Sequence, residues 1–451
     1  MRKASFFLAS LLTITVMTAT APQAEAAFEP PQPVVSEAAY MVNLDTDVVI
    51  YEKNPDQRRV PASLTKMMTA ILVLENVPDI ENTIYDAPSQ VFDEFYGKNV
   101  STADFRPYEE ATVQDYLYGL LLNSACEAAS VLAYHVGGGS IPNFVQMMND
   151  KAKELGAVNT RFGNAHGLEN PDQYSTARDM AIIARYAIEN FPAFNKIVET
   201  SEYTIGPSNK HTESRKLFNT NMLLRKTDVN YPYALGIKTG TLDEAGYCLA
   251  SYAKKDGYSY LLVTLGAPIY DEAGQRLPLK DRGCYTDAIN LYNWAFSTFE
   301  ITTVISPDED IMEFGVELGD GKDYVMLRPD TEYSTLLPKN LDSTAIQRIK
   351  PDKLTITAPV KKGEVLGELE LRLANETLTK VKLLAAEDVA LSKTLYYLKI
   401  GKEFLSSGWF KLGLGLLAVL IVFFVYLRIT SKRRKRQKAR PRLMPKNRKY
   451  Q

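Results

Sequence analysis

The chain has 451 residues, of which 45% are apolar and 24% charged, and its formal net charge is −2. This composition excludes collagen-like, disulfide-framework and wholly disordered proteins, and the length predicts two domains. The near-neutral total hides an uneven distribution of charge. Twelve basic and no acidic residues occupy positions 428–451, residues 1–27 carry +1, and residues 28–427 therefore carry −15.

The first 26 residues are predicted to form a secretory signal peptide. Arg2 and Lys3 precede an apolar stretch over residues 6–18, and Ala24-Glu25-Ala26 fits a cleavage site with small residues at its ends. A retained N-terminal anchor is the alternative. Pro22 and the small residues after the apolar stretch favour cleavage, which would start the mature chain near residue 27.

In chain order, a proline-rich lead-in over residues 28–35 is followed by a predicted β-hairpin over 39–51, which turns at Asp45-Thr46-Asp47. A helix is expected from Ser63 onward, because apolar residues recur there every three or four positions. The other expected elements are helical segments over 113–136, 141–155 and 177–189, strands over 203–205, 233–238, 247–254 and 258–266, and a closing helix over 286–299.

Strands on both sides of a helical middle predict an α/β domain over residues 27–300, whose sheet pairs N-terminal with C-terminal strands. After residue 300, short alternating segments are separated by Gly, Pro and Asp turns. They predict a small all-β domain over 301–388. Residues 389–408 are expected to form a linker, with an amphipathic stretch over 392–405.

A second apolar segment lies near the C-terminus. Residues 412–427 are uncharged, and Trp409 and Phe410 extend them towards the ~20 residues that a membrane-spanning helix needs. The basic tail over 429–451 follows directly, and such flanks stay in the cytoplasm. Nucleic-acid binding is the alternative for a basic tail, but beside a membrane span we expect contact with lipid headgroups and no nucleic-acid partner. We predict a single-pass protein with a transmembrane helix over 409–428 and an exported body.

Three cysteines are few for an exported protein, and an odd number cannot be fully paired. They are Cys126, Cys248 and Cys284. A bond between Cys248 and Cys284 is one alternative, and buried free thiols are the expected default.

The sequence lacks the motifs of several common chemistries. It contains three histidines, no His-Glu-x-x-His motif and no cysteine pair with metal-ligand spacing. It has neither a phosphate-binding Gly-x-x-x-x-Gly-Lys-Ser/Thr loop nor a Gly-x-Ser-x-Gly elbow. Three histidines still allow a Ser-His-Asp triad.

Ser63 and Lys66 lie three residues apart at the start of the expected helix, so they share one face. A neutral Lys66 amine could take the Ser63 proton and create a nucleophile without histidine. Burial and a second cation would both lower the pKa of such a lysine. Taken alone, the motif is weak, because most chance occurrences are surface helix starts with a solvated lysine.

Two further segments carry polar residues that suit a site. Residues 236–241 lie at the end of a predicted strand, where Lys238 offers a cation for a carboxylate, Thr239 and Thr241 offer hydroxyls, and Gly240 permits close approach of a ligand. An edge-strand lysine and a turn are the alternative. Residues 120–129 read as a helix interrupted by a small polar loop at Ser124, which could equally be a helix cap.

Ser-x-x-Lys, Ser-x-Asn and Lys-Thr-Gly, in this order, are the signature of penicillin-binding proteins and serine β-lactamases. The longer segments resemble the low-molecular-weight D-alanyl-D-alanine carboxypeptidases over roughly residues 30–390. The similar segments are 59–70 (RVPASLTKMMTA), 164–168 (NAHGL), 176–180 (TARDM), 219–224 (NTNMLL), 236–240 (GIKTG) and 245–247 (AGY).

The resemblance implies a serine β-lactamase-like catalytic domain with an antiparallel sheet and a helical cluster, a small β-domain and a C-terminal membrane attachment. It implies that Ser63 is the nucleophile, Lys66 its base and Ser124 a proton relay between Lys66, Lys238 and the leaving amine. Lys238 and Thr239, helped by Thr241, would bind the terminal carboxylate beside Gly240. The N–H groups of Ser63 and Thr241 would form the oxyanion hole.

By the same resemblance, the reaction is release of D-Ala from peptidoglycan stem peptides that end in D-Ala-D-Ala, through an acyl-enzyme. It implies no metal or organic cofactor, and acylation of Ser63 by β-lactams. Two other hypotheses stay open, a β-lactamase and a non-catalytic wall-binding protein. A full membrane span, in place of a peripheral helix, favours a Gram-positive source.

Cys126 departs from the pattern, because the family has Asn there. An amide can donate to the substrate carbonyl and accept from Lys66, and a thiol does both poorly. Either the enzyme tolerates Cys126 in its substrate site with an altered rate or substrate preference, which we favour, or it has drifted towards binding. His166 has neighbours, Asn164 and Gly167, that favour a loop-shaping role over that of a general base.

Overall fold

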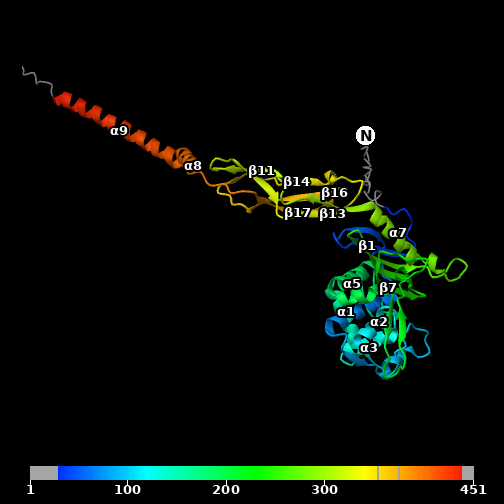
Figure 1. Cartoon of the computed structure of the whole chain (residues 1–451). Helices are drawn as coiled ribbons and strands as arrows, with labels where there is room; N and C mark the ends of the chain where they lie inside the picture. Colours follow the sequence, from blue (N-terminus) through cyan, green and yellow to red (C-terminus); the bar gives the residue numbers. More distant parts are fainter. Residues whose placement is uncertain (1–28, 353–354, 374–375, 439–451) are drawn as a thin grey trace, which may run out of the picture. The chain divides into compact units, whose positions relative to one another are not determined.

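The computed structural model describes residues 29–438 except 353–354 and 374–375 (Figure 1). The predicted signal peptide and residues 439–451 of the basic tail lie outside the described residues. The chain divides into two compact units. The first extends to Thr302 and includes Ser334–Ser343, and the second contains Thr303–Tyr333 and the chain from Thr344 onward.

The first unit contains a five-stranded antiparallel sheet in the order β2-β1-β9-β8-β7. Its strands are β1 (Ala38–Asn43), β2 (Val49–Lys53), β7 (Ala234–Leu242), β8 (Gly246–Lys255) and β9 (Tyr258–Ala267). β1 pairs with β9, as expected for N-terminal and C-terminal strands. The β1–β2 hairpin forms where its turn was predicted, because Asn43 Oδ1 accepts hydrogen bonds from the N–H groups of Asp45 and Thr46.

Both faces of this sheet are buried, since alternate residues of a strand point to opposite sides. In β9, Leu261 and Val263 join a core with the helical cluster, whereas Tyr260 and Leu262 join a second core with α7 (Gly283–Thr298). The helical cluster consists of α1 (Lys66–Asn76), α2 (Val113–Leu121), α3 (Cys126–Val136), α4 (Ile141–Glu154), α5 (Ala177–Asn190) and α6 (Pro192–Glu199). Figure 1 shows α1, α2, α3 and α5 gathered beside the sheet.

Short elements complete the first unit. Two-stranded pairs join β3 (Ile84–Asp86) to β4 (Glu110–Thr112) and β5 (Glu202–Ile205) to β6 (Arg215–Phe218). The 3₁₀ segments are η2 (Ala62–Thr65), η3 (Ser89–Phe95), η4 (Met222–Leu224) and η5 (Leu279–Asp281). The helix expected over 113–136 is interrupted between α2 and α3, as the polar residues there predicted.

The second unit contains a six-stranded sheet in the order β14-β16-β17-β12-β11-β15. The strands are β11 (Met312–Glu317), β12 (Tyr324–Pro329), β14 (Gln347–Ile349), β15 (Thr355–Thr357), β16 (Val365–Leu373) and β17 (Glu376–Ala385). The chain passes between the units along β10 (Phe299–Ile305) and β13 (Tyr333–Pro338). The predicted small all-β domain after residue 300 is therefore confirmed.

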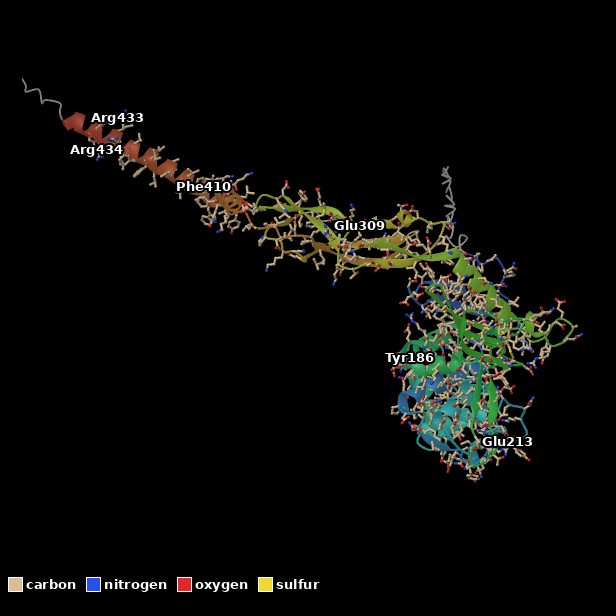
Figure 2. The ribbon with its side chains drawn as sticks, viewed as in Figure 1. Tyr186, Glu213, Glu309, Phe410, Arg433 and Arg434 are labelled. Atoms are coloured by element: carbon tan, nitrogen blue, oxygen red, sulfur yellow. The ribbon has the colours of Figure 1, made fainter. Side chains whose placement is uncertain are left out.

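The chain after the β-sheet is helical. Within the predicted linker, α8 (Lys393–Ser406) begins after Ser392, whose side chain accepts a hydrogen bond from the N–H of Leu395. α9 (Gly408–Lys438) follows, and its segment Gly408–Arg434 contains an 18-residue stretch with a mean hydropathy of 2.5, long and apolar enough to cross a membrane. Figure 2 shows Phe410 near one end of α9 and Arg433 and Arg434 near the other.

Candidate active site

Ser63 and Lys66 meet at the junction of η2 and α1. A 3₁₀ segment has three residues per turn, so side chains three positions apart align. Lys66 Nζ donates to Ser63 Oγ at 3.0 Å. Lys66 is fully buried whereas Ser63 is partly exposed, so the hydroxyl can meet a ligand while the amine cannot meet bulk water.

The Lys66 amine has two further acceptors. They are the main-chain oxygen of His166 at 2.5 Å and Cys126 Sγ at 3.6 Å. Burial lowers the pKa of Lys66, which favours the neutral amine. A neutral amine has a lone pair that can accept the Ser63 proton. The site can therefore activate a hydroxyl without an imidazole.

Ser124 lies in the interruption between α2 and α3. The N-cap position of α3 is Ala125, so the interpretation of Ser124 as the cap is wrong. Its backbone is left-handed, with φ of 61°, which for a non-glycine residue costs about 1–3 kcal/mol and is common at functional sites. Ser124 shares a cavity with Ser63. Among the described residues no hydrogen bond joins Ser124 Oγ to Lys66 or Lys238.

Residues 236–241, which were predicted at the end of a strand, all lie within β7 (Ala234–Leu242). β7 was expected to end at Lys238, but it continues to Leu242, because its pairing with β8 extends to the contact between Leu242 and Gly246. β7 is an edge strand of the sheet, yet Lys238 is 1% exposed. The alternative was right that Lys238 is on an edge strand and wrong about the turn, since the strand continues to Leu242.

Burial, and then the charge of Lys66, hold the pKa of Lys238 well below its usual value. Lys238 Nζ donates to the carbonyl oxygen of Thr239 at 3.1 Å. The hydroxyl of Thr239 donates to Thr220 Oγ1 at 2.8 Å. A bound carboxylate would favour the charged form of Lys238, so this end of the site suits an anionic ligand.

Gly240 brings β7 against the segment that carries the nucleophile. A Cβ at Gly240 would lie 3.1 Å from the carbonyl oxygen of Pro61 and 3.2 Å from the backbone nitrogen of Ser63. Such contacts are tighter than ordinary van der Waals contact. The absence of a side chain at Gly240 therefore lets β7 lie close to the backbone that carries Ser63.

One cavity of about 220 Å³ brings together Ser63, Ser124, Thr239, Gly240 and Thr241. Lys66 and Lys238 do not line this cavity themselves, but each contacts a residue that does, Ser63 and Thr239.

Sequence analysis missed two arginines that line this cavity, Arg276 and Arg282. Arg276 Nε donates to the hydroxyl of Tyr247 at 3.0 Å, and the Arg282 guanidinium lies 4.9 Å from the centre of the same ring. No motif surrounds either arginine. Only the fold brings Arg276 and Arg282, which precede α7 in the chain, to the end of β7. The two guanidinium groups add positive charge to the cavity near the part of β7 that carries Lys238.

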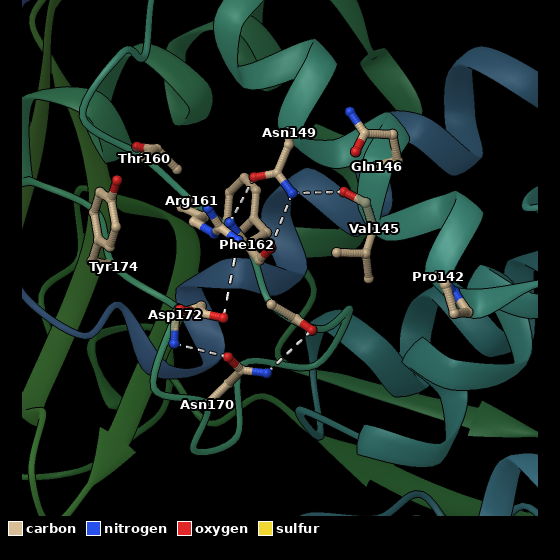
Figure 3. Close-up of a pocket in the computed structure, with 11 residues that line it drawn as sticks. Pro142, Val145, Gln146, Asn149, Thr160, Arg161, Phe162, Asn170, Asp172 and Tyr174 are labelled. Atoms are coloured by element: carbon tan, nitrogen blue, oxygen red, sulfur yellow. Dashed lines mark hydrogen bonds and ion pairs between the residues drawn. The ribbon is translucent and has the colours of Figure 1, made fainter.

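A larger cavity of about 530 Å³ lies between α4 and residues 160–174 (Figure 3). Asn149 ties its two walls together, because its side chain bonds to the N–H and C=O of Phe162 at 2.8 and 3.0 Å. This cavity contains none of the predicted catalytic side chains. Cavity size therefore does not identify the site.

The three cysteines are free and buried, which is the expected default. Burial raises the pKa of the Cys248 thiol to about 11. No group of three or more His, Cys, Asp or Glu side chains within the described ranges could hold a metal ion.

His166 shapes its loop, as predicted. Its Nδ1 accepts from the N–H of Leu168 at 3.2 Å, and Asn164 Oδ1 accepts from the N–H of Gly167 at 2.6 Å. The ring contacts Glu94, and only the main-chain oxygen of His166 reaches Lys66.

Comparisons with known proteins agree with this geometry. The family model of peptidase S11, D-alanyl-D-alanine carboxypeptidase, matches residues 23–269, and that of the penicillin-binding protein 5 C-terminal domain matches residues 299–391. The chain is 30% identical over 388 residues to D-alanyl-D-alanine carboxypeptidase DacA of Haemophilus influenzae, covering 85% of this chain and 92% of the relative.

Solved structures give the same result. Penicillin-binding protein 5 from Haemophilus influenzae superposes with a TM-score of 0.60 at 28% identity, covering 80% of this chain and 99% of that one. The Streptomyces K15 DD-transpeptidase superposes with a TM-score of 0.53 at 31% identity, covering 59% and 98%. Its solved variants include serine-to-alanine and cysteine-to-alanine changes two positions apart, the spacing of Ser124 and Cys126 here. The chain belongs to the D-alanyl-D-alanine carboxypeptidase family of serine peptidases, peptidase S11.

Proposed function

We propose that this protein is a membrane-anchored serine-type D-Ala-D-Ala carboxypeptidase that removes the terminal D-Ala from peptidoglycan stem peptides. The observation that carries the proposal is the hydrogen bond between the buried Lys66 amine and Ser63 Oγ, on the wall of a cavity that ends in Thr239, Gly240 and Thr241. Membership of the carboxypeptidase family supports the same reaction.

In the acylation step, neutral Lys66 takes the proton of Ser63 Oγ, which attacks the carbonyl carbon of the D-Ala–D-Ala bond. The N–H groups of Ser63 and Thr241 hold the oxyanion, a contribution of roughly 3–4 kcal/mol per donor in other acyl-transfer enzymes. The C–N bond then breaks as Ser124 donates its hydroxyl proton to the leaving amine and takes from Lys66 the proton that came from Ser63. Water hydrolyses the resulting ester, which frees the shortened peptide and restores Ser63.

The terminal carboxylate of the substrate orients the scissile bond. Lys238 and Thr239 bind it, Thr241 helps, and Arg276 and Arg282 add positive charge at the same end of the cavity. Holding the substrate by its free carboxylate selects a C-terminal residue, which makes the enzyme a carboxypeptidase. A β-lactam carries a comparable carboxylate and an amide, so it acylates Ser63 and blocks the site.

The body is exported, and α9 anchors it from the C-terminal side. The basic residues that follow the apolar part of α9 lie in the cytoplasm and contact lipid headgroups, with no nucleic-acid partner. A full span in place of a peripheral anchor supports a Gram-positive source.

Release of D-Ala tests this function directly. The full-length protein in detergent, incubated with a peptidoglycan pentapeptide that ends in D-Ala-D-Ala, is expected to release one free D-Ala per peptide. Released D-Ala is measured by chromatography. A folded protein that binds penicillin covalently yet releases no D-Ala would contradict the proposal and favour a wall-binding role.

Replacing Cys126 with asparagine is expected to accelerate acylation by the peptide. The amide adds a donor for the substrate carbonyl and an acceptor for Lys66, and one such hydrogen bond contributes about 0.5–1.5 kcal/mol, or roughly two- to tenfold in rate. The measurement is the rate of D-Ala release by Cys126→Asn. Cys126→Ala is the matched comparison: it removes the thiol that contacts Lys66 and adds no amide, so it should not be accelerated. An unchanged rate in Cys126→Asn would show that the position is unimportant.

A further inference from the structure

The main-chain carbonyl of His166 controls how the Lys66 amine is oriented. A carbonyl oxygen only accepts, so the 2.5 Å contact uses one N–H of Lys66. Cys126 Sγ, at 3.6 Å, is an acceptor for a second N–H. A neutral amine has only two N–H groups. When both bond to these acceptors, its lone pair faces Ser63 Oγ at 3.0 Å, and the hydroxyl donates to the amine instead of accepting from it. The position of the carbonyl thus decides whether the amine faces the nucleophile as a base.

The loop that carries this carbonyl is held from several sides. Thr69 Oγ1 on α1 donates to the carbonyl oxygen of Ala165 at 2.6 Å. Asn164 Nδ2 donates to the carbonyl oxygen of Leu168 at 3.0 Å. Gly167 has a φ of +81°, and a Cβ at this position would lie 2.0 Å from the carbonyl oxygen of Ala62. The loop therefore packs directly against the backbone of the segment that carries Ser63.

The His166 ring joins this loop to another part of the fold. Because Nδ1 accepts from the N–H of Leu168, the neutral imidazole carries its proton on Nε2, which donates to Glu94 Oε2 at 3.1 Å. Glu94 belongs to η3, and its Oε1 accepts from the hydroxyl of Ser130 on α3 at 2.8 Å. Phe95 lies edge-on to the same ring. Glu94 therefore links η3 and α3 to the loop that holds Lys66.

The protonation states fit this arrangement. Burial lowers the pKa of His166, which favours the neutral ring. Burial alone would raise the pKa of Glu94, but hydrogen bonds from His166 and Ser130 bring it below its usual value. The pair is thus a neutral imidazole that donates to a carboxylate, which fixes one tautomer and one ring orientation.

We propose that Glu94 is a positioning residue for acylation: it fixes the His166 ring, and through the ring the carbonyl that orients Lys66 towards Ser63. This inference rests on the proposed function, because it needs Lys66 to act as the base. Glu94 does not line the cavity that holds Ser63, so it acts on the amine and leaves the carboxylate-binding end untouched.

The test separates acylation from binding. For the full-length protein in detergent, stopped-flow measurement with a fluorescent penicillin gives the dissociation constant of the initial complex and the rate constant of acylation. Glu94→Ala is expected to slow acylation by roughly ten- to a hundredfold, because small misplacements of a catalytic group have effects of this size. Its dissociation constant should remain unchanged, since Lys238, Thr239 and Thr241 are untouched.

Glu94→Gln should restore most of the rate. Its amide oxygen can accept from His166 and its amide N–H can donate to Ser130 Oγ. Glu75→Ala is the matched control: it removes a carboxylate that accepts from the Tyr186 hydroxyl at 2.8 Å on the surface of α1, and it should acylate at the wild-type rate.

Three results would overturn the inference: a wild-type acylation rate in Glu94→Ala, a loss confined to binding, or equal slowing by the Ala and Gln substitutions. If Glu94→Ala does not fold, Glu94→Asp replaces it. Glu94→Asp shortens the side chain by one methylene group and moves the carboxylate away from the His166 ring, so acylation should slow. An unchanged acylation rate would reject the positioning role. Failure of the wild-type protein to react with penicillin would instead contradict the proposed function, so the two failures are distinguishable.

Discussion

Replacing Ser63 with alanine is expected to abolish both the release of D-Ala and covalent attachment of penicillin while the fold remains intact. The substitution removes only Oγ, which lies 3.0 Å from Lys66 Nζ and is the attacking atom of the proposed reaction. In serine peptidases, loss of the nucleophile lowers kcat by roughly 10⁶-fold. The measurements are intact-mass spectrometry with benzylpenicillin and the D-Ala assay, with the melting temperature as the test of folding.

Ser89→Ala is the matched control for this loss. It removes a hydroxyl that accepts from Tyr108 at 2.9 Å in an exposed part of the chain, so acylation should not change. Retention of D-Ala release by Ser63→Ala would mean that another residue is the nucleophile, or that a water attacks the substrate directly.

Replacing Lys66 with methionine should have the next largest effect. Methionine fills the buried site but supplies no base, and loss of general-base catalysis costs roughly 10²–10⁴-fold in rate. Burial lowers the pKa of Lys66, and only the neutral amine can accept a proton. The wild-type acylation rate should therefore fall as the pH is lowered through this pKa, at a pH below the range where an ordinary lysine titrates. Lys66→Met should lose this limb of the pH profile.

Lys66→Arg separates the role of a base from that of a positive charge. Arginine keeps the charge and cannot become neutral in a protein, so this variant should also be inactive. An active Lys66→Arg would show that the charge of Lys66 matters and its basicity does not. An unchanged pH limb in Lys66→Met would show that another group titrates in that limb.

Local sequence signals predicted the parts of the fold that depend on neighbouring residues. The β1–β2 turn follows from side-chain bonds of Asn43 within four residues, and the interruption between α2 and α3 follows from the polar residues there. The pairing of β1 with β9 followed from where the strand-like segments lie in the chain. The end of β7 was wrong, because pairing with β8 extends a strand beyond what its own residues indicate.

In the candidate site, too, the residues within local motifs were predicted, and the residues that depend on distant contacts were not. Ser63, Ser124 and Lys238 were identified because their motifs have fixed spacing and match a family. Arg276 and Glu94 were missed, because each acts through a partner distant in sequence: Tyr247 for Arg276 and His166 for Glu94. Neither contact leaves a local pattern. The left-handed backbone of Ser124 was equally unpredictable, since it is imposed by the packing around it.

The central claim is that Ser63 forms an acyl-enzyme that turns over. Its most direct test is mass spectrometry of the full-length protein, first with benzylpenicillin and then with a peptide that ends in D-Ala-D-Ala. The account predicts one covalent penicillin adduct per chain, on the tryptic peptide that contains Ser63, and release of one D-Ala per peptide. A folded protein with no adduct, or with the adduct on Cys126 or another residue, would contradict it.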